Sequence, residues 1–253
     1  MKTITILSWN RPHYLKECVE ALAKCRGVKD YGVLISVDGG GSKVEVPPGL
    51  DAEVVYMKMP YGIDEHNFVC YEGVFTNGGG QIDFNIALED DVILTPDALE
   101  LADWFYHHPK KDEYAYLCLG DPTYNYDARD EHYSTVRDTQ KLYTSAWCFT
   151  KKSWEVMREF WNRPLQTEQG WDWSLAYTLL EHNWRGLAPV VSRARNIGRE
   201  GVHSFPAWFD EHVAHAAFSD GRNSKFRIER HYERPPGWFE REVNAQYGRQ
   251  RNS

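Results

Sequence analysis

Apolar runs and helical patterns alternate along the first part of the chain. Residues 3–8 and 33–37 are continuous apolar runs rich in β-branched residues, which is typical of strands buried on both faces of a parallel sheet. Pro12, which suits the first turn of a helix, stands between them. Apolar side chains then recur at helical spacing, at Leu15, Cys18, Val19, Leu22 and Cys25. The pattern predicts a β-α-β unit.

The same alternation continues along the rest of the chain. Further strands are expected at 53–57, 84–88 and 114–119, and further helices at 67–75, 96–104, 153–160 and 172–180. The polar, tyrosine-rich stretch 121–139 is the longest candidate loop, and long loops beside α/β sheets usually carry function. The expected fold class is α/β, with a mostly parallel sheet flanked by helices.

Polar side chains follow three of the expected strands. Asn10 and Arg11 follow the first strand, Asp38 follows the second, and Glu89-Asp90-Asp91 follows the fourth. Ligands of open α/β sheets bind beyond the carboxyl ends of the strands, so we expect a site there. Three adjacent carboxylates need a positive partner, and Mg²⁺ or Mn²⁺ held by carboxylates and substrate phosphates would supply it. The alternative is an acidic turn before a helix, where the helix dipole would favour Asp97.

Composition excludes several classes of protein. The 253 residues are 42% hydrophobic and 26% charged, as in an ordinary globular protein with a sizeable core. No run approaches the roughly 20 apolar residues of a membrane span and no signal peptide is visible, so we expect a soluble protein without a membrane partner. Five cysteines without a CxxC pair favour reduced, buried thiols in a cytoplasm.

Charge is distributed unevenly. The chain has 29 basic and 37 acidic residues, a net charge of −8, which argues against a surface that binds nucleic acid throughout. Residues 222–253 alone carry eight basic and four acidic side chains, a local charge of +4. The net charge of the whole chain therefore does not decide whether a polyanion binds.

Several motifs, in order, resemble a known enzyme family. Asn-Arg-Pro after the first strand, Ser-Val-Asp-Gly at the second and Leu-Glu-Asp-Asp-Val at the fourth are similar to GT-A fold glycosyltransferases that use nucleotide-sugar donors. The closer resemblance is to the β-1,2-N-acetylglucosaminyltransferase I family. Its later motifs match Gly170-Trp171-Asp172-Trp173, 198–203 and 209–212. The resemblance covers residues 3–215.

The resemblance implies a fold and a division of the chain. The fold would be α/β of the GT-A (Rossmann-like) type, with a mixed, mostly parallel sheet flanked by helices. The GT-A domain would comprise residues 1–221, with a donor half at about 1–120 and an acceptor half at about 121–221. A basic C-terminal arm would follow at 222–253.

The implied function is metal-dependent, inverting transfer of a sugar from a UDP-sugar, of the UDP-GlcNAc or UDP-Glc type, to an acceptor hydroxyl. Mn²⁺ or Mg²⁺ would neutralise charge on the departing UDP. By resemblance, Glu89 would face the donor sugar, Asp90 the ribose and Asp91 the metal.

Four further roles follow from the resemblance. Arg11 and Asp38 would hold the uridine, with His66 as a further nucleotide contact. Asp172 would be the general base that takes the proton of the acceptor hydroxyl. The family motif has two aspartates where this chain has Trp171-Asp172, and a helix cap or first-turn acid is the alternative for Asp172.

Candidate phosphate and metal ligands follow in the last motifs. Arg199 is the first candidate for pairing with phosphates, ahead of Arg193 and Arg195, and a solvated face is the alternative for all three. His203 is a candidate metal or diphosphate ligand, with a structural histidine as an equal alternative. The nearby His212 and His215 are expected to be structural.

The acceptor is open between a glycan, a protein and modified DNA. Trp147 and Trp171 are candidates for stacking on an acceptor, although most large aromatic side chains pack in cores. The basic arm suits a phosphate backbone, so a hydroxymethylated base in DNA is an alternative acceptor. A metal-dependent nucleotidyltransferase is a second alternative, because Gly39-Gly40-Gly41 precedes Ser42-Lys43 in a weak likeness to a phosphate loop. The sequence does not decide the oligomeric state.

Overall fold

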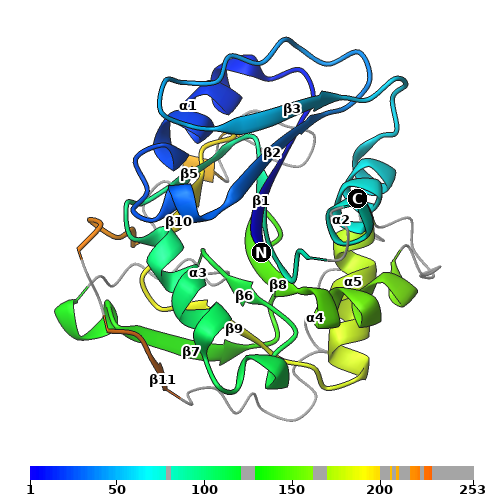
Figure 1. The fold of residues 1–253 in the computed structure, drawn as a ribbon. Helices are drawn as coiled ribbons and strands as arrows, with labels where there is room; N and C mark the ends of the chain where they lie inside the picture. Colours follow the sequence, from blue (N-terminus) through cyan, green and yellow to red (C-terminus); the bar gives the residue numbers. More distant parts are fainter. Residues whose placement is uncertain are drawn as a thin grey trace.

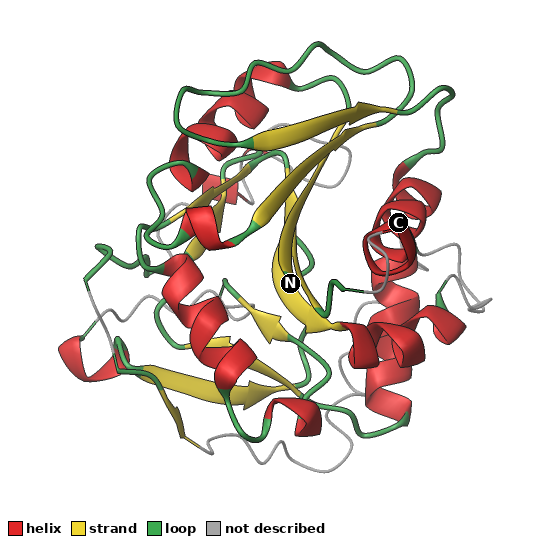
Figure 2. Ribbon diagram, viewed as in Figure 1, coloured by secondary structure: helices red, strands yellow, loops and turns green. Residues whose placement is uncertain are grey.

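The computed structural model is built around one nine-stranded mixed sheet (Figures 1 and 2). It describes residues 1–77, 81–120, 129–161, 170–199, 206, 209–210, 217–222 and 225–229. The strand order is β11-β7-β9-β6-β8-β4-β1-β2-β3. Strands β5 and β10 form a separate two-stranded antiparallel ribbon.

The first half of the sheet is parallel and comes from the first ninety residues. Its strands are β1 (Lys2–Ser8), β2 (Gly32–Val37), β3 (Ala52–Tyr56) and β4 (Phe84–Glu89). Ser8 pairs with Val37 and Leu7 with Glu89, so the carboxyl ends of β1, β2 and β4 lie level. The residues that follow these strands therefore meet at one edge of the sheet, as the sequence predicts.

The second half of the sheet is mixed. Its strands are β6 (Leu117–Cys118), β7 (Thr135–Thr139), β8 (Ala146–Thr150), β9 (Gly186–Pro189) and β11 (Arg227–Glu229). β8 runs antiparallel to both β4 and β6, β9 is parallel to β6, and β11 is parallel to β7. The ribbon pairs β5 (Val92–Leu94) with β10 (Ala194–Asn196), directly after the acidic motif.

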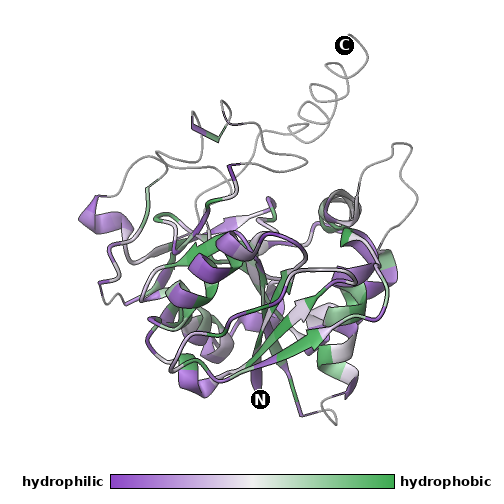
Figure 3. Ribbon diagram, turned by 90° about the horizontal axis from the view of Figure 1, so that it is seen from above, coloured by the Kyte–Doolittle hydropathy of each residue, from purple (hydrophilic) through white to green (hydrophobic). Residues whose placement is uncertain are grey.

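Helices cover both faces of the sheet in Figure 1. One side holds α1 (Pro12–Leu22) and α3 (Ala98–His107), and the other holds α2 (Ile63–Asn77), α4 (Lys151–Met157) and α5 (Trp171–Glu181). Short 3-10 helices lie at Val28–Asp30, Lys111–Glu113, Asp130–His132 and Arg158–Phe160. Figure 3 shows mostly hydrophobic strands inside and hydrophilic residues on outer loops and helix surfaces. No helix in the described part of the chain is long and apolar enough to cross a membrane.

An aromatic cluster packs α2, α4 and α5 against the sheet. Trp171 stacks on Trp161 with ring centroids 4.4 Å apart and planes 10° apart, and on Trp147 at 6.3 Å. Trp147 is fully buried and Trp171 is 4% exposed. The expectation that these two rings stack on an acceptor is therefore wrong, because their faces are covered by other core rings.

The expected elements are largely present, with differences in the second half. The expected strand 114–119 shortens to β6, and the expected loop 121–139 contains β7. β11 lies within the segment 222–253, where it adds a strand beside β7. All five cysteines are buried thiols outside any disulfide, as predicted.

Candidate active site

An arginine bridges the acidic motif to the end of the first strand. Arg11 stands at the N-cap position of α1, where Pro12 occupies the first turn. Its Nη1 donates to Asp91 Oδ2 at 2.6 Å, and its Nη2 donates to Asp90 Oδ1. Ser8 Oγ donates to Asp90 Oδ2 at 2.9 Å. The Arg11 side chain is 33% exposed, whereas those of Asp90 and Asp91 are 3% and 6% exposed, so the cluster is buried but reachable.

The ribbon β5–β10 supplies the other side of Asp91. Asn196 Nδ2 donates to Asp91 Oδ1 at 2.9 Å, and Gly198 N donates to Asn196 Oδ1 at 2.7 Å. A Cβ on Gly198 would lie 2.1 Å from Asp91 Oδ2. The backbone at position 198 therefore packs directly against this carboxylate, and no side chain larger than that of glycine fits there.

Burial and mutual repulsion change the acidity of the motif. Glu89 ends β4, and burial together with the charge of Asp91 raises the pKa of Glu89 to about 8. Burial also raises the pKa of Asp90, although the charge of Arg11 opposes this rise. Asp90 and Asp91 share one arginine, Arg11, so negative charge exceeds positive charge in the motif. The motif therefore favours binding of an additional cation.

The acidic motif fits a metal that is shared with a substrate. Within the described residues, no three His, Cys, Asp or Glu side chains converge as a chelating group. Mg²⁺ and Mn²⁺ sites often use one or two carboxylates and take their remaining ligands from water and substrate phosphates. Asp91, which lies beside the partly exposed Arg11, fits this type of site.

Asp38 organises the loop beside the acidic motif. Its Oδ1 accepts the N–H groups of Gly39 and Tyr61, both at 2.8 Å, and its Oδ2 accepts that of Gly62 at 3.0 Å. Burial would raise the pKa of Asp38, but these three backbone donors outweigh it and lower the pKa. Asp38 thereby links the end of β2 to the start of α2, and a carboxylate has lone-pair capacity for one further donor.

His66 lies under this loop, in the first part of α2. Its Nε2 makes a 2.8 Å hydrogen bond with Ser36 Oγ, and the residue is 5% exposed. Burial lowers the pKa of His66 despite the nearby charge of Asp38. The structure therefore places His66 beneath Asp38, where it supports the loop from within.

The glycines after Asp38 have a packing explanation. A Cβ on Gly39 would lie 2.1 Å from the carbonyl carbon of Met59, and one on Gly41 would lie 2.4 Å from the carbonyl oxygen of Trp9. Both positions bring two backbone segments too close for any side chain. The close packing accounts for these glycines without a phosphate loop.

The first turns of α2 and α5 meet at Gly170. A Cβ on Gly170 would lie 3.2 Å from Asp172 Oδ1 and 3.3 Å from Asp64 Oδ1, so both carboxylates face the same small gap. Asp172 and Asp64 are both half-buried. Gly62, two residues before Asp64, donates to Asp38, which connects this acidic pair to the loop that Asp38 organises. Both sequence interpretations of Asp172, first-turn acid and base, are compatible with this position.

The later candidates separate into different environments. Arg199 is exposed and its Nη2 pairs with Asp210 Oδ2 at 2.6 Å. Arg195 lies over the ring of Phe218, with its guanidinium carbon 4.3 Å from the centroid. His203, His212 and His215 lie outside the described residues.

Arg193 is a core residue, which corrects its two predicted roles of phosphate ligand and solvated residue. It is fully buried, its Nε donates to Asp97 Oδ2 at 3.1 Å, and its other nitrogens donate to the carbonyl oxygens of Val191 and Tyr133. Asp97 also accepts hydrogen bonds from Thr95 and Ser219. No surface of Arg193 is left for a ligand.

Exposed apolar side chains gather at the same edge as the acidic motif. Among the large hydrophobic residues that the described regions expose, four lie on loops or element ends there: Trp9, Tyr56, Met59 and Ile63. Their exposed fractions lie between 48% and 64%. An apolar rim around a charged cluster suits a ligand with a ring and a charged part.

Sequence reasoning missed several residues that shape the site. Ser8, Asn196, Gly198 and Asp64 contact or face the acidic groups, but they lie outside the acidic motif itself. Gly198 was part of a matched motif, whereas the pairing of Asn196 with Asp91 depends on a ribbon that joins positions about a hundred residues apart. Local sequence patterns do not predict a pairing between residues so far apart in the chain.

Comparison with known proteins gives a likeness at the level of structure only. No family model matches the sequence, and no curated protein matches it. Solved structures do match. TarS 1–349 from S. aureus aligns with a TM-score of 0.52 at 11% identity, over 79% of this chain and 61% of that one. Its complex with UDP-GlcNAc aligns with the same TM-score at 13% identity, over 80% and 60% of the two chains.

A mannosyltransferase from Pyrobaculum calidifontis, PcManGT, in complex with GDP-Man and Mn²⁺, aligns at 14% identity with a TM-score of 0.48, over 82% of this chain and 59% of that chain. The present chain thus spans about three fifths of the length of the structures it resembles. The likeness confirms the expected fold class, a mixed, mostly parallel GT-A sheet flanked by helices.

Proposed function

We propose that this protein is a metal-dependent, inverting glycosyltransferase that moves a sugar from a UDP-sugar, of the UDP-GlcNAc or UDP-Glc type, to an acceptor hydroxyl. One observation carries the proposal: Arg11, Asp90, Asp91 and Asn196 are brought together at the carboxyl ends of parallel strands. The fold, which is shared with the UDP-GlcNAc complex of TarS, supports the nucleotide-sugar donor. The resemblance of the motifs to β-1,2-N-acetylglucosaminyltransferase I belongs to this proposal as well.

The donor side is assigned to the strand ends. Asp91 would hold Mn²⁺ or Mg²⁺, which when bound supplies positive charge for the leaving diphosphate. Arg11 would help to hold the uridine, and Asp90, which accepts hydrogen bonds from Ser8 and Arg11, would face the ribose. Asp38 orders the loop that would hold the uridine, with His66 supporting it, and Glu89 would face the sugar.

The remaining assignments concern the acceptor side. Asp172, in the first turn of α5, would accept the proton of the attacking hydroxyl, so that one displacement inverts the anomeric carbon. Arg199 would pair with the diphosphate and His203 would contribute to the metal or diphosphate. The division into a donor half, an acceptor half and a basic arm is part of the same proposal.

The acceptor is proposed to be a glycan or protein hydroxyl. In the described part of the basic segment Arg222 pairs with Asp130 and Asp220, and Arg227 pairs with Glu229, so nearby acids offset part of the positive charge on which the DNA alternative depends. Packing accounts for Gly39 and Gly41, and Gly40 has a φ of +79°, which favours glycine, so the glycines that motivated the nucleotidyltransferase alternative have a structural explanation.

The test is a donor panel with purified protein. UDP-GlcNAc, UDP-Glc, GDP-Man and NTPs are incubated with and without Mn²⁺, and free nucleotide and pyrophosphate are measured by mass spectrometry. We expect slow, Mn²⁺-dependent release of UDP from one UDP-sugar. Release of pyrophosphate from an NTP, or no binding of any UDP-sugar, would overturn the proposal.

Asp172 is tested separately from donor binding. The Asp172→Asn variant should bind the donor with unchanged affinity and transfer about 10²- to 10⁴-fold more slowly, since it lacks a base. Asp64→Asn is the matched control, because Asp64 faces the same glycine. If Asp64→Asn loses transfer and Asp172→Asn keeps it, the base is Asp64.

A further inference from the structure

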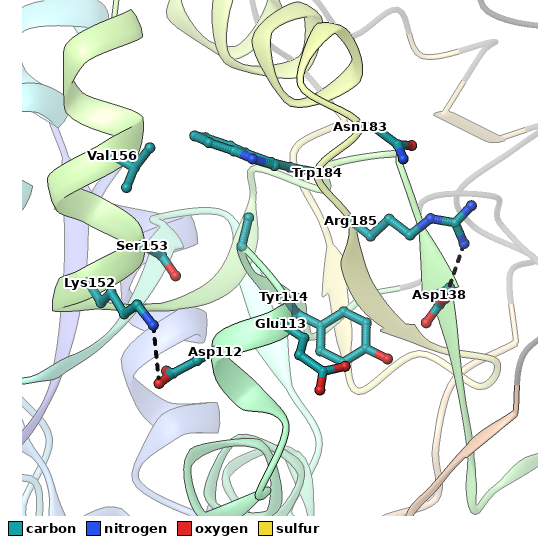
Figure 4. Close-up of a pocket in the computed structure, with 11 residues that line it drawn as sticks. Asp112, Glu113, Tyr114, Asp138, Lys152, Ser153, Val156, Asn183, Trp184 and Arg185 are labelled. Atoms are coloured by element: carbon teal, nitrogen blue, oxygen red, sulfur yellow. Dashed lines mark hydrogen bonds and ion pairs between the residues drawn. The ribbon is translucent and has the colours of Figure 1, made fainter.

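A cavity lies away from the acidic motif. It has a volume of about 740 Å³ and lies between the 3-10 helix Lys111–Glu113, α4, the end of β7 and the start of β9 (Figure 4). Its polar lining includes Asp112, Glu113, Asp138, Lys152 and Arg185, and its largest ring is that of Trp184. None of these residues belongs to the proposed donor or acceptor site.

Strand register places this cavity at the opposite edge of the sheet. β8 is antiparallel to β4, with Thr150 beside Phe84 and Ala146 beside Leu88, so α4 begins at the amino end of β4. Thr139 at the end of β7 pairs with Gly186 at the start of β9, at that same edge. Five residues of strand separate Phe84 from Glu89, which is about 17 Å. One small ligand cannot occupy both sites.

A buried acceptor without a partner lines the cavity. Asp138 Oδ2 pairs with Arg185 Nη1 at 3.1 Å, whereas Asp138 Oδ1 is buried and has no hydrogen-bond partner. The side chain of Asp138 is 11% exposed. An unpaired buried oxygen costs free energy, and a small rotation of the Asp138 carboxylate toward the cavity would let a ligand hydroxyl donate a hydrogen bond to it.

An aromatic ring and separable charges complete the lining. Trp184 is half-buried and packs against His182, with centroids 5.2 Å apart, and in Figure 4 its indole lies between Val156 and Asn183 at one side of the cavity. Across the cavity, Lys152 Nζ lies 3.4 Å from Asp112 Oδ2, and both side chains are more than half exposed. An exposed ion pair of this kind contributes little, so its groups can turn to a ligand.

We propose that this cavity is a second, non-catalytic binding site for a neutral saccharide chain. A tryptophan face offers an apolar surface to the C–H groups of a sugar ring, while carboxylates, an amide and an arginine match its hydroxyls. Three carboxylates against two cations give no preference for an anion, and the polar rim does not suit an apolar ligand. The proposal is independent of transfer at the other edge.

The experiment is isothermal titration calorimetry of the full chain with neutral hexasaccharides: maltohexaose, cellohexaose, mannohexaose and chitohexaose. We expect at least one to bind at millimolar or lower concentration. Trp184→Ala should weaken that binding by about tenfold, the effect of losing one stacking contact, whereas Trp184→Phe should keep most of it. Binding should persist in Asp91→Asn, which acts on the donor site.

Further variants guard against a folding defect. Asp112→Ala removes an exposed carboxylate of the lining and should weaken binding severalfold, while Glu155→Ala, an exposed acid of α4 outside the cavity lining, should not. Absence of binding by all four saccharides overturns the proposal. Unchanged affinity in Trp184→Ala and Asp112→Ala overturns it as well, and so does exclusive binding of a basic peptide such as oligolysine.

Discussion

Two arginine–carboxylate clusters stand at the two ends of the short strand β5, and they differ in how completely they are satisfied. Before β5, Arg11 is a third exposed and serves two carboxylates, Asp90 and Asp91. After β5, Arg193 and Asp97 are both fully buried. The three guanidinium nitrogens of Arg193 and both carboxylate oxygens of Asp97 have hydrogen-bond partners. In each cluster an acid beside the same strand meets an arginine from a distant part of the chain.

The difference separates a structural cluster from a binding one. In the Arg193 cluster the charges balance and the hydroxyls of Thr95 and Ser219 complete the network, so a ligand has nothing to contact. In the Arg11 cluster two carboxylates share one arginine, so negative charge is in surplus, and the arginine is a third exposed, so solvent reaches the cluster. Balance and closure indicate stability, whereas imbalance with access indicates binding.

The largest expected effect is the loss of Arg193. Arg193→Met leaves Asp97 buried without its counter-ion and should lower the free energy of unfolding by about 3–5 kcal/mol, measured by urea denaturation. Arg11→Met should cost clearly less, because water reaches the Arg11 cluster. Equal losses in the two variants would remove the distinction between the clusters. Adding Asp97→Asn to Arg193→Met should restore part of the stability.

The next effect concerns ligand-linked stability. Mn²⁺ with UDP at a hundred times its dissociation constant should raise the unfolding free energy by about 2.7 kcal/mol, seen as a higher melting temperature. Asp91→Asn should abolish this rise. Asp51→Asn is the matched control and should retain the rise, because Asp51 is an exposed acid just before β3 and outside the proposed site. A ligand-induced rise that persists in Asp91→Asn contradicts the metal assignment.

Two serines allow a finer comparison. Ser219 Oγ donates to Asp97 at 3.1 Å and Ser8 Oγ donates to Asp90 at 2.9 Å, so Ser219→Ala and Ser8→Ala remove equivalent contacts. Each should cost about 1–3 kcal/mol in unfolding free energy. Because Ser8 positions Asp90 for the ribose, Ser8→Ala should also weaken ligand binding, so Mn²⁺ and UDP should raise the cost of Ser8→Ala and leave that of Ser219→Ala unchanged. The same ligand response in both variants would count against the comparison.

The smallest effect comes from an acid held by backbone donors instead of an arginine. Because the pKa of Asp38 is lower in the folded than in the unfolded chain, its ionisation stabilises the fold above the unfolded pKa of about 3.9. The stability difference between wild type and Asp38→Asn should be constant at neutral pH and shrink as the pH falls below about 4. Denaturation of both proteins across this range measures it. A difference that grows on acidification contradicts the sign of the shift.

The parallel half of the fold was predictable because its signals are local. The runs that became β1, β2 and β4 are continuous, and a parallel sheet brings their following residues together whatever the loops do. Arg11, Asp38 and the acidic motif could therefore be placed at one edge from sequence.

The mixed half was not predictable to the same degree. β7 lies in a polar, tyrosine-rich stretch, and β6 keeps only Leu117–Cys118 of its expected length. Asn196 meets Asp91, and Arg193 meets Asp97, through pairings across about a hundred residues. Such contacts depend on tertiary packing, which propensity and periodicity do not encode.

Strand β11 determines how the basic segment can be studied by shortening the chain. A protein that ends before Arg222 would lose β11 and leave the N–H and C=O groups along one side of β7 unpaired, which is a template for edge-to-edge aggregation. Loss of DNA binding after such a truncation could then result from aggregation as well as from loss of contacts between the basic segment and DNA. Charge-neutralising substitutions after Glu229, in a chain that keeps β11, separate the two.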